Sequence, residues 1–456
     1  MGGEWATVPF NDLGEVNRGR SRHRPRYAEH LYGGPYPFIQ TGDIRESGGR
    51  ITSHSQTYSE EGLKQSRLWP AGTMCITIAA NIAETAILSY PACFPDSVVG
   101  FIADDNKCHV RFVEYSFRHI KRLIQAEASG SVQDNINLGT LSRLEIPLPP
   151  LPEQKAIAHV MGSLDDKIEL NRRMNETLEK MAQALFKSWF VDFDPVIDNA
   201  LAAGNPIPEP LAQRAETRRQ AIANGTANRE SAQAFPASFR FTEELGWIPE
   251  GWEVKKMDQM LRSVSDTYPL KTVDKIIFLN TGDILDGKFL HADFSETTRL
   301  PGQAKKSIQK HDILYSEIRP KNRRFAYVHF NGTQHVVSTK LMVLRATTEI
   351  SPLFTYLILK QDTTIDHLQM LAESRSGTFP QITFDILAGI QLALPPNPDI
   401  VDIFTKKILQ TTQKKQLQLE ASTNTLAKLR DVLLPKLISG ELRIPQAEKM
   451  VEEAIG

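Results

Sequence analysis

The stretch Ile146-Pro147-Leu148-Pro149-Pro150-Leu151-Pro152-Glu153-Gln154 determines how the rest of the chain is interpreted. Proline lacks a backbone N–H and fixes φ, so the prolines up to Pro150 are excluded from a helix interior. Pro152 and Glu153 instead suit a first helical turn, because proline tolerates that position and a carboxylate is favoured at the positive end of the helix dipole. The sequence therefore predicts that a helix begins here.

This predicted helix continues to Trp189 with no further proline and with Gly162 as its one glycine. Asn171 and Asn175 interrupt its apolar seam, as polar residues do in coiled coils that fix their register at some cost in stability. About 38 helical residues span roughly 57 Å, which favours a strut over an average core helix. The apolar residues that recur at alternating steps of three and four are Met161, Leu164, Ile168, Leu178, Ala182, Leu185 and Trp189.

A second proline-rich stretch, residues 392–399 (LALPPNPD), precedes a second predicted long helix. The two proline doublets lie 246 residues apart, and the Thr-Leu pairs at 177–178 and 425–426 lie 248 apart. Two helices of similar length with interrupted seams can pair with each other, and the alternative is that each caps its own domain. The seam of the second helix consists of Leu409, Thr412, Gln416, Leu419, Thr423, Leu426 and Leu433.

The two halves of the chain also match outside the helices. Residues 38–44 (FIQTGDI) correspond to residues 278–284 (FLNTGDI), and each reads as an apolar strand running into a Thr-Gly-Asp turn. Further matches in the same order are residues 129–133 (SGSVQ) with 376–381 (SGTFPQ), and Trp5 with Trp252. Matches at offsets between 240 and 248 predict an internal duplication with pseudo-twofold symmetry rather than a solenoid.

Length and composition are those of a globular protein of two to four domains, with 456 residues, 41% hydrophobic and 23% charged. No apolar run reaches the ~18 residues of a membrane span, and residues 1–6 fit neither a secretory signal nor a myristoylation pattern. Cys75, Cys93 and Cys108 match no metal or disulfide spacing, so we expect free thiols in a reducing cytoplasm.

Each globular half mixes strand-like and helical runs, which predicts an α+β domain. Strands are expected at residues 73–78, 87–90, 98–102, 313–315, 325–330 and 340–344, and helices at 113–126 and 353–373. The predicted order is a globular domain at 1–150, a long helix at 151–193, a linker at 194–246 with a short helix at 211–223, a second globular domain at 247–396, a second long helix at 397–440 and a tail at 441–456.

Basic residues cluster in both halves, although the formal net charge is only −1. In the first half Arg18, Arg20, Arg22, Arg24 and Arg26 alternate, which on an extended segment places the guanidinium groups on one face. Like charges placed side by side repel each other unless a bound anion neutralises them. The arginine guanidinium group can form paired hydrogen bonds with phosphate and with the major-groove edge of guanine. A solvated basic loop is the alternative for either cluster alone. The second half carries Lys305, Lys306, Arg319, Lys321, Asn322, Arg323 and Arg324.

Amide side chains that could pair bidentately with adenine accompany these clusters, although such residues more often form turns or caps. They are Asn81, Gln133, Asn135, Asn322 and Gln381. The sequence contains no dinucleotide-binding, phosphate-loop, zinc-protease or nucleophile-elbow motif. The match of residues 192–196 (DFDPV) to a methyltransferase motif and of residues 253–255 (EVK) to a nuclease motif is superficial. We therefore expect no catalytic residue and no metal ligand.

In these features the chain resembles the DNA-specificity (S) subunits of Type I restriction-modification systems. The resemblance is carried by residues 146–154 with the following helix, 185–195 (LFKSWFVDFDP), 246–252 (GWIPEGW) and 433–442 (LLPKLISGEL). It covers nearly the whole chain, because the order of domain and helix is repeated twice. The second helix start departs from the family pattern, with Asn397-Pro398-Asp399 in place of Leu-Pro-Glu.

The resemblance implies two target-recognition domains held apart by two antiparallel helices, each reading one half of a split, asymmetric DNA target. The helices would dock two methyltransferase (M) subunits, which bind S-adenosylmethionine and methylate adenine. Motor-nuclease (R) subunits, using ATP and Mg²⁺, would join for cleavage in phage defence. The chain itself would be cytoplasmic, would bind no cofactor and would supply specificity. Helix pairing and M docking would involve Leu164, Ile168, Leu178, Leu185, Leu409, Leu419, Leu426 and Leu433.

Two other functions remain open from the sequence. A DNA-modifying enzyme acting alone would need a cofactor loop and paired acids, and labelled S-adenosylmethionine would reveal its activity. A coiled-coil scaffold that binds DNA without reading its sequence would leave the duplicated halves unexplained. Comparing random with selected DNA would separate a scaffold from a specificity subunit.

Overall fold

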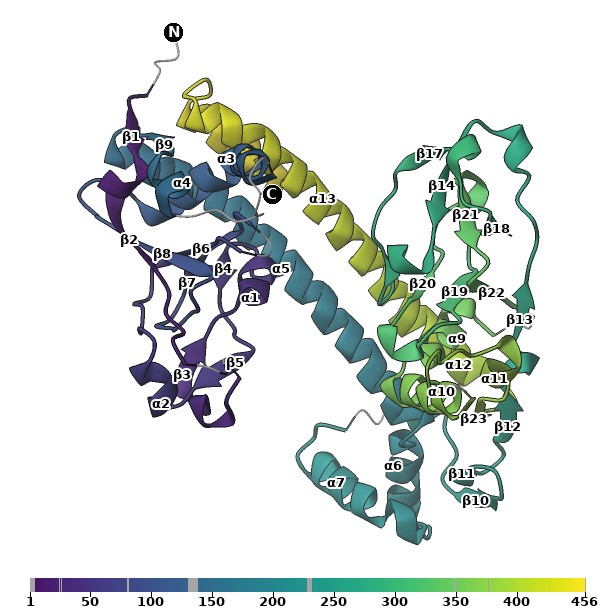
Figure 1. Ribbon diagram of the computed structural model, residues 1–456. Coiled ribbons are helices and arrows are strands. Elements are labelled where there is room, and N and C mark those ends of the chain that lie inside the picture. Colours follow the sequence, from purple (N-terminus) through teal and green to yellow (C-terminus); the bar gives the residue numbers. More distant parts are fainter. Residues whose placement is uncertain are drawn as a thin grey trace. The chain divides into compact units, whose positions relative to one another are not determined.

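The computed structural model describes residues 5–23, 25, 27–79, 82–129, 138–227, 232–347, 350–375 and 377–455, without the side chains of 122–129. The chain divides into two compact units, of which unit 1 comprises Met1–Met174 and Gln418–Gly456 and unit 2 comprises Asn175–Leu417. Two long helices, α5 (Leu151–Phe190) and α13 (Gln410–Ile438), each contribute a segment to both units (Figure 1). Helix α5 begins within the proline-rich stretch, as predicted.

Unit 1 contains a five-stranded sheet of order β2-β8-β6-β7-β4. The strands are β2 (Gly14–Arg18), β4 (Arg50–Ile51), β6 (Met74–Thr77), β7 (Thr85–Leu88) and β8 (Val98–Ala103). Two smaller pairs join β1 (Thr7–Pro9) to β9 (Glu145–Pro147) and β3 (Tyr32–Phe38) to β5 (Gln56–Tyr58). The helices besides α5 and α13 are α1 (Thr41–Glu46), α2 (Glu60–Lys64), α3 (Val110–Ser129), α4 (Leu138–Ser142) and α14 (Ile444–Ile455).

Unit 2 contains a sheet of order β13-β22-β19-β20 and a second sheet of order β17-β14-β21-β18. Their strands are β13 (Leu261–Val264), β14 (Lys275–Leu279), β17 (Phe294–Glu296), β18 (Ala304–Ser307), β19 (Ile313–Ser316), β20 (Phe325–Tyr327), β21 (His335–Ser338) and β22 (Leu341–Ala346). Smaller pairs are β10 (Phe239–Thr242) with β11 (Gly246–Pro249), β12 (Glu253–Lys256) with β23 (Gln391–Leu394), and β15 (Ile284–Leu285) with β16 (Lys288–Phe289). The α+β class is confirmed.

The predicted duplication is visible in the strand connections of the two units. The order β2-β8-β6-β7 in unit 1 corresponds to β13-β22-β19-β20 in unit 2, and the pair β1–β9 corresponds to β12–β23. The Thr-Gly-Asp turns also match, because the backbone N–H of Gln40 donates to Asp43 and that of Asn280 donates to Asp283, each at 2.8 Å. The pseudo-twofold arrangement stays a prediction.

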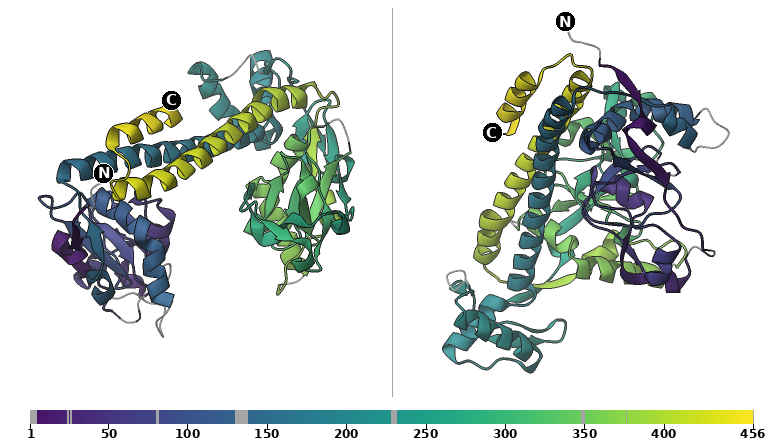
Figure 2. Two further views of the ribbon diagram at one scale, coloured as in Figure 1. Left: turned by 90° about the horizontal axis from the view of Figure 1, so that it is seen from above. Right: turned by 90° about the vertical axis from the view of Figure 1, so that its left-hand side faces the viewer.

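Within unit 1 the two long helices lie side by side and antiparallel (Figures 1 and 2). Arg430 on α13 donates to Asp165 on α5 at 3.1 Å, and further along α5 the buried Asn171 donates to Ser422 at 3.1 Å. The interruption of the seam at Asn171 is therefore matched by a hydrogen-bond partner, which a buried amide requires. In unit 2, Gln416 donates to the backbone carbonyl of Asn175 at 3.4 Å.

The structure corrects two elements of the sequence prediction. The single helix expected at 353–373 is two helices, α9 (Pro352–Leu359) and α10 (Asp362–Arg375). The expected short helix at 211–223 is confirmed as α7 (Ala212–Ala223), but the segment called a linker also contains α6 (Asp194–Ala203). Paired contacts join α6 to α7, since Arg214 bonds Asp194 and Arg218 bonds Asp198. None of the described helices is long and apolar enough to cross a membrane.

Candidate nucleic-acid interface

The first basic cluster continues from the edge strand β2 and presents its described arginines to solvent. Arg18, Arg20 and Arg22 are exposed, whereas the intervening Gly19 and Ser21 are buried. A Cβ on Gly19 would lie 2.3 Å from the Pro95 carbonyl oxygen, so this position accepts no larger residue without movement of the backbone. The close approach of Gly19 to the backbone of Pro95 fixes the segment so that exposed arginines alternate with buried residues, as the sequence predicted.

The exposed arginines of this cluster keep their charge available for a ligand. None of Arg18, Arg20 and Arg22 forms an ion pair with another residue in the part of the chain that the structure describes. Tyr27, which follows them, is 77% exposed. Arg24, Arg26, Asn81 and Gln133, also predicted to bind DNA, lie outside the described residues, as does Asn135.

The second basic cluster contains two arginines that brace the fold of unit 2. Arg323 contacts the carboxylates of Asp362 and Asp286, and the hydrogen bond to Asp362 chiefly raises its pKa. Arg324 donates to the carbonyls of Gly282 at 3.0 Å and Ile284 at 2.9 Å. These guanidinium groups hold the loop after β19 against its neighbours.

Lys306 has a similar bracing role in unit 2. Its ammonium group donates to the carbonyls of Thr339 and Leu341 at 3.1 and 2.8 Å, and burial lowers its pKa. The adjacent Lys305 is exposed.

The remaining members of the second cluster face solvent at the turn Pro320–Asn322. Arg319, Lys321 and Asn322 are all exposed. Both residues that flank the turn have left-handed backbones, with φ 42° at Arg319 and 52° at Arg323. Non-glycine residues in this conformation are strained and persist where the surrounding structure determines them. The turn therefore presents a fixed set of cationic and amide groups.

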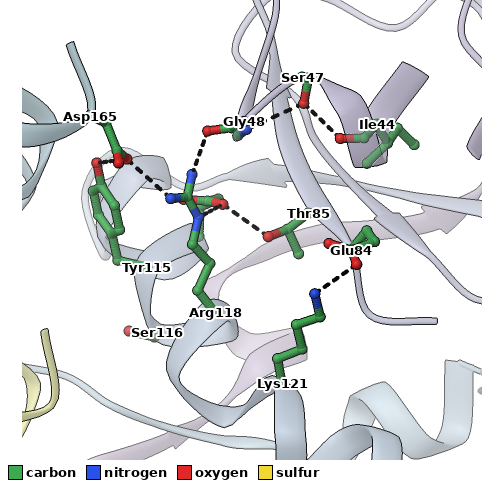
Figure 3. A network of polar contacts seen from close by, with 12 residues as sticks. Ile44, Ser47, Gly48, Glu84, Thr85, Tyr115, Ser116, Arg118, Lys121 and Asp165 are labelled. Atoms are coloured by element: carbon green, nitrogen blue, oxygen red, sulfur yellow. Dashed lines mark hydrogen bonds and ion pairs between the residues drawn. The ribbon is translucent and has the colours of Figure 1, made fainter. Parts of the chain in front are cut away.

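A partly buried ionic network ties the globular part of unit 1 to its helix pair (Figure 3). Arg118 on α3 contacts Glu114 at 2.5 Å, Asp165 on α5 at 3.1 Å and the Gly48 carbonyl at 3.1 Å. Tyr115 and Arg430 both donate to Asp165 as well, at 2.9 and 3.1 Å. One carboxylate thus connects α3, α5 and α13.

Burial governs the electrostatics of this network. It raises the pKa of Glu114, against the opposing effects of Arg118 and the Thr85 hydroxyl, which donates at 2.9 Å. Burial alone would lower the pKa of Arg118, but the carboxylates of Glu114 and Asp165 outweigh it and the net shift is upward. Sequence inspection missed these residues, and the only local signal is the spacing of four between Glu114 and Arg118 on a helix.

The residues predicted to pair the helices lie mainly in the interior. Leu164, Ile168, Leu426 and Leu433 are buried in one core of unit 1. In unit 2, Leu409 is buried in the core and Leu185 packs against that core. Of the other two, Leu419 is buried and Leu178 is half-buried. Methyltransferase docking on these helices stays a prediction.

Groups able to hold a metal ion are not found among the described residues, where no three His, Cys, Asp or Glu side chains gather. Cys75, Cys93 and Cys108 are buried and unpaired, and burial raises the pKa of Cys93 to about 11.

Comparisons with known proteins place these features in one family. The Type I restriction modification DNA specificity domain matches the chain twice, at residues 2–180 and 249–421. The HindI specificity subunit of Haemophilus influenzae is 43% identical over 172 residues, which are 36% of this chain and 38% of that protein. The MjaIX specificity subunit of Methanocaldococcus jannaschii is 26% identical over 458 residues, which are 97% of this chain and 94% of that protein.

One solved structure shows the same fold over nearly the whole chain. The S subunit of a Type I restriction-modification system from M. genitalium aligns with a TM-score of 0.53 at 15% identity, covering 95% of this chain and 96% of that one. This likeness bears on the fold alone.

Proposed function

Because the chain belongs to the DNA-specificity (S) subunits of Type I restriction-modification systems, we propose that it reads a divided DNA target, one half with each unit. The observation that carries this proposal is the repetition of one strand order in both units, together with an exposed basic surface on each. In unit 1 this surface is Arg18, Arg20 and Arg22, and in unit 2 it is Arg319, Lys321 and Asn322.

Arginine at such positions serves two purposes in DNA recognition. Contacts to phosphates supply affinity and register, whereas bidentate contacts to guanine in the major groove supply sequence discrimination. Asn322 adds an amide suited to adenine. The two basic surfaces differ in sequence, so the two half-sites are expected to differ and the whole target to be asymmetric.

The long helices are proposed to carry two methyltransferase subunits, which supply adenine methylation with S-adenosylmethionine. On α5 in unit 1 two apolar side chains four residues apart, Leu170 and Met174, are exposed on one face at 50% and 37%, which suits a partner contact. Motor-nuclease subunits with ATP and Mg²⁺ would add cleavage. The relatives are named specificity subunits, which favours a non-catalytic role for this chain within a cytoplasmic complex.

Methylome sequencing of cells that carry this chain with its partner subunits tests the proposal. The expected motif has two short specified halves separated by unspecified bases, with a methylated adenine in each half on opposite strands. Replacing residues 1–150 by the equivalent domain of another specificity subunit should change one half only. A continuous motif, a palindrome or a swap that alters both halves would contradict the divided-reader proposal.

A further inference from the structure

Each unit carries a strongly exposed aromatic side chain. Among the large hydrophobic residues that the structure describes, Tyr27 and Phe379 are the most exposed, at 77% and 70%. Tyr27 follows the arginine row of unit 1, and Phe379 lies on the loop between α10 and α11 (Phe384–Ala388) in unit 2. Single exposed hydrophobic residues are common on proteins, so the surroundings of these residues must decide their role.

The loop that carries Phe379 is joined to the basic turn of unit 2 by its backbone. The N–H of Arg319 donates to the Pro380 carbonyl at 3.0 Å, and the N–H of Ile382 donates to the Glu317 carbonyl at 2.9 Å. An isolated β-bridge links Ile318 to Gln381 between these bonds. The two loops therefore form one platform.

Buried neighbours hold this platform from beneath while Phe379 remains outside. Pro380 and Ile382 are buried on the same loop, and Pro320 is buried on the other. Beneath the turn, the N–H of Lys321 donates to the side chain of Gln369 at 3.1 Å. These anchors fix the backbone of the loop, and the Phe379 side chain is 70% exposed on it.

The side chains around Phe379 are those of a nucleic-acid surface. Arg319, Arg375 and Lys321 supply positive charge, and Asn322 and Gln381 supply amides, all of them exposed. The Arg319 guanidinium donates to the Thr378 carbonyl at 3.4 Å, which places it against the segment preceding Phe379. Proteins that open a base step use apolar wedges, phenylalanine among them, beside cationic groups that hold the backbone.

We propose that Phe379 inserts at a base step of the half-site read by unit 2 and stacks on an exposed base. The inference rests on the proposed function and deepens it by naming how bases are engaged.

The test uses the full chain co-purified with its methyltransferase subunits and a duplex bearing the motif found by methylome sequencing. Stacking of a base on an aromatic ring predicts that Phe379→Ala weakens binding about 5- to 150-fold (about 1–3 kcal/mol at 1.4 kcal/mol per tenfold change). The salt dependence should be unchanged, because the deleted ring is uncharged. Phe379→Trp should keep the parent affinity.

Three further measurements distinguish a base contact from a structural effect. Phe294→Ala is the matched control, since Phe294 is 51% exposed in the same unit, and it should bind DNA as the parent does. With 2-aminopurine placed in turn at each position of the half-site, the parent should raise emission at one step and Phe379→Ala should not. Unfolding temperatures of both variants should match the parent.

The outcomes separate the inference from the proposed function. Parent-like binding by Phe379→Ala, or an equal loss on motif and scrambled duplexes, would overturn the inference while leaving the divided reader intact. A parent complex that binds motif and scrambled duplexes equally would instead overturn the proposed function, and the inference with it.

Discussion

Removing the guanidinium group of Arg118 should destabilise unit 1 more than any surface ion pair does. Arg118→Leu leaves Glu114, which is 2% exposed, without its cation and leaves Asp165 with one partner fewer. Breaking a buried ion pair by deleting one member costs about 3–5 kcal/mol. For a domain of this size each kcal/mol lowers the unfolding temperature by about 2–4 °C, so the expected drop is about 6–20 °C.

The loss should also depend on pH. The pKa of Glu114 in the folded chain is raised above its ordinary value of 4.5, so the native state binds more protons than the unfolded chain. Stability from this group is therefore greatest below that value and falls as pH rises toward the raised pKa. Without Arg118 the raised pKa rises further, and the penalty should be larger at pH 8 than at pH 5.

Differential scanning calorimetry of the full chain at both pH values measures this effect. Lys64→Leu is the control in the same unit, because the Lys64–Glu61 pair is exposed, with side-chain exposures of 70% and 58%. Exposed pairs contribute about 0–1 kcal/mol, so this variant should shift the transition little. The double variant Arg118→Leu with Glu114→Gln should recover part of the loss. Equal losses at pH 5 and pH 8, or parent-like unfolding of Arg118→Leu, would refute the reasoning.

Three further predictions concern the helices and the basic surfaces. Leu426→Asp places a carboxylate in the core that Leu426 shares with Leu164, so co-purification with methyltransferase subunits should be abolished, whereas Leu68→Asp, at an exposed position outside both long helices, should retain it. Replacing Arg18, Arg20 and Arg22 by Ala should flatten the salt dependence of DNA binding by about 0.9 for each phosphate that the variant no longer neutralises, and an unchanged slope would show that they do not face DNA. Arg319→Ala should reduce that slope without changing the unfolding temperature, whereas Arg323→Ala should do the opposite; the reverse pattern would contradict the division between exposed and bracing arginines.

Local sequence patterns correctly predicted those features that are determined by neighbouring residues. Proline positions and apolar spacing placed the start of α5, and alternation placed the exposed arginines of unit 1. The internal matches predicted a repeat, and the same strand order then recurs in both units. These features depend on residues close together in sequence, or on the comparison of one half with the other.

Features that depend on distant partners were not predictable in the same way. Asp165 meets Arg118 across 47 positions, and each Asp–Arg pair of the α6–α7 hairpin spans 20, so no periodicity marks them. The second basic cluster shows the same limit. Arg319 and Arg323 are equivalent as residue types, and only the fold determines which guanidinium group meets a carboxylate.

The difference between arginines paired with carboxylates and exposed arginines explains how a chain of net charge −1 can present basic surfaces to DNA. Many of its carboxylates are engaged by bracing arginines, as Asp165 is by Arg118 and Asp362 by Arg323. Arg18, Arg20, Arg22 and Arg319, by contrast, form no ion pair with any residue that the structure describes. The neutral total therefore limits long-range attraction to DNA without removing local contacts. Affinity is expected to come from a few phosphate contacts, which leaves discrimination to groups that reach the bases.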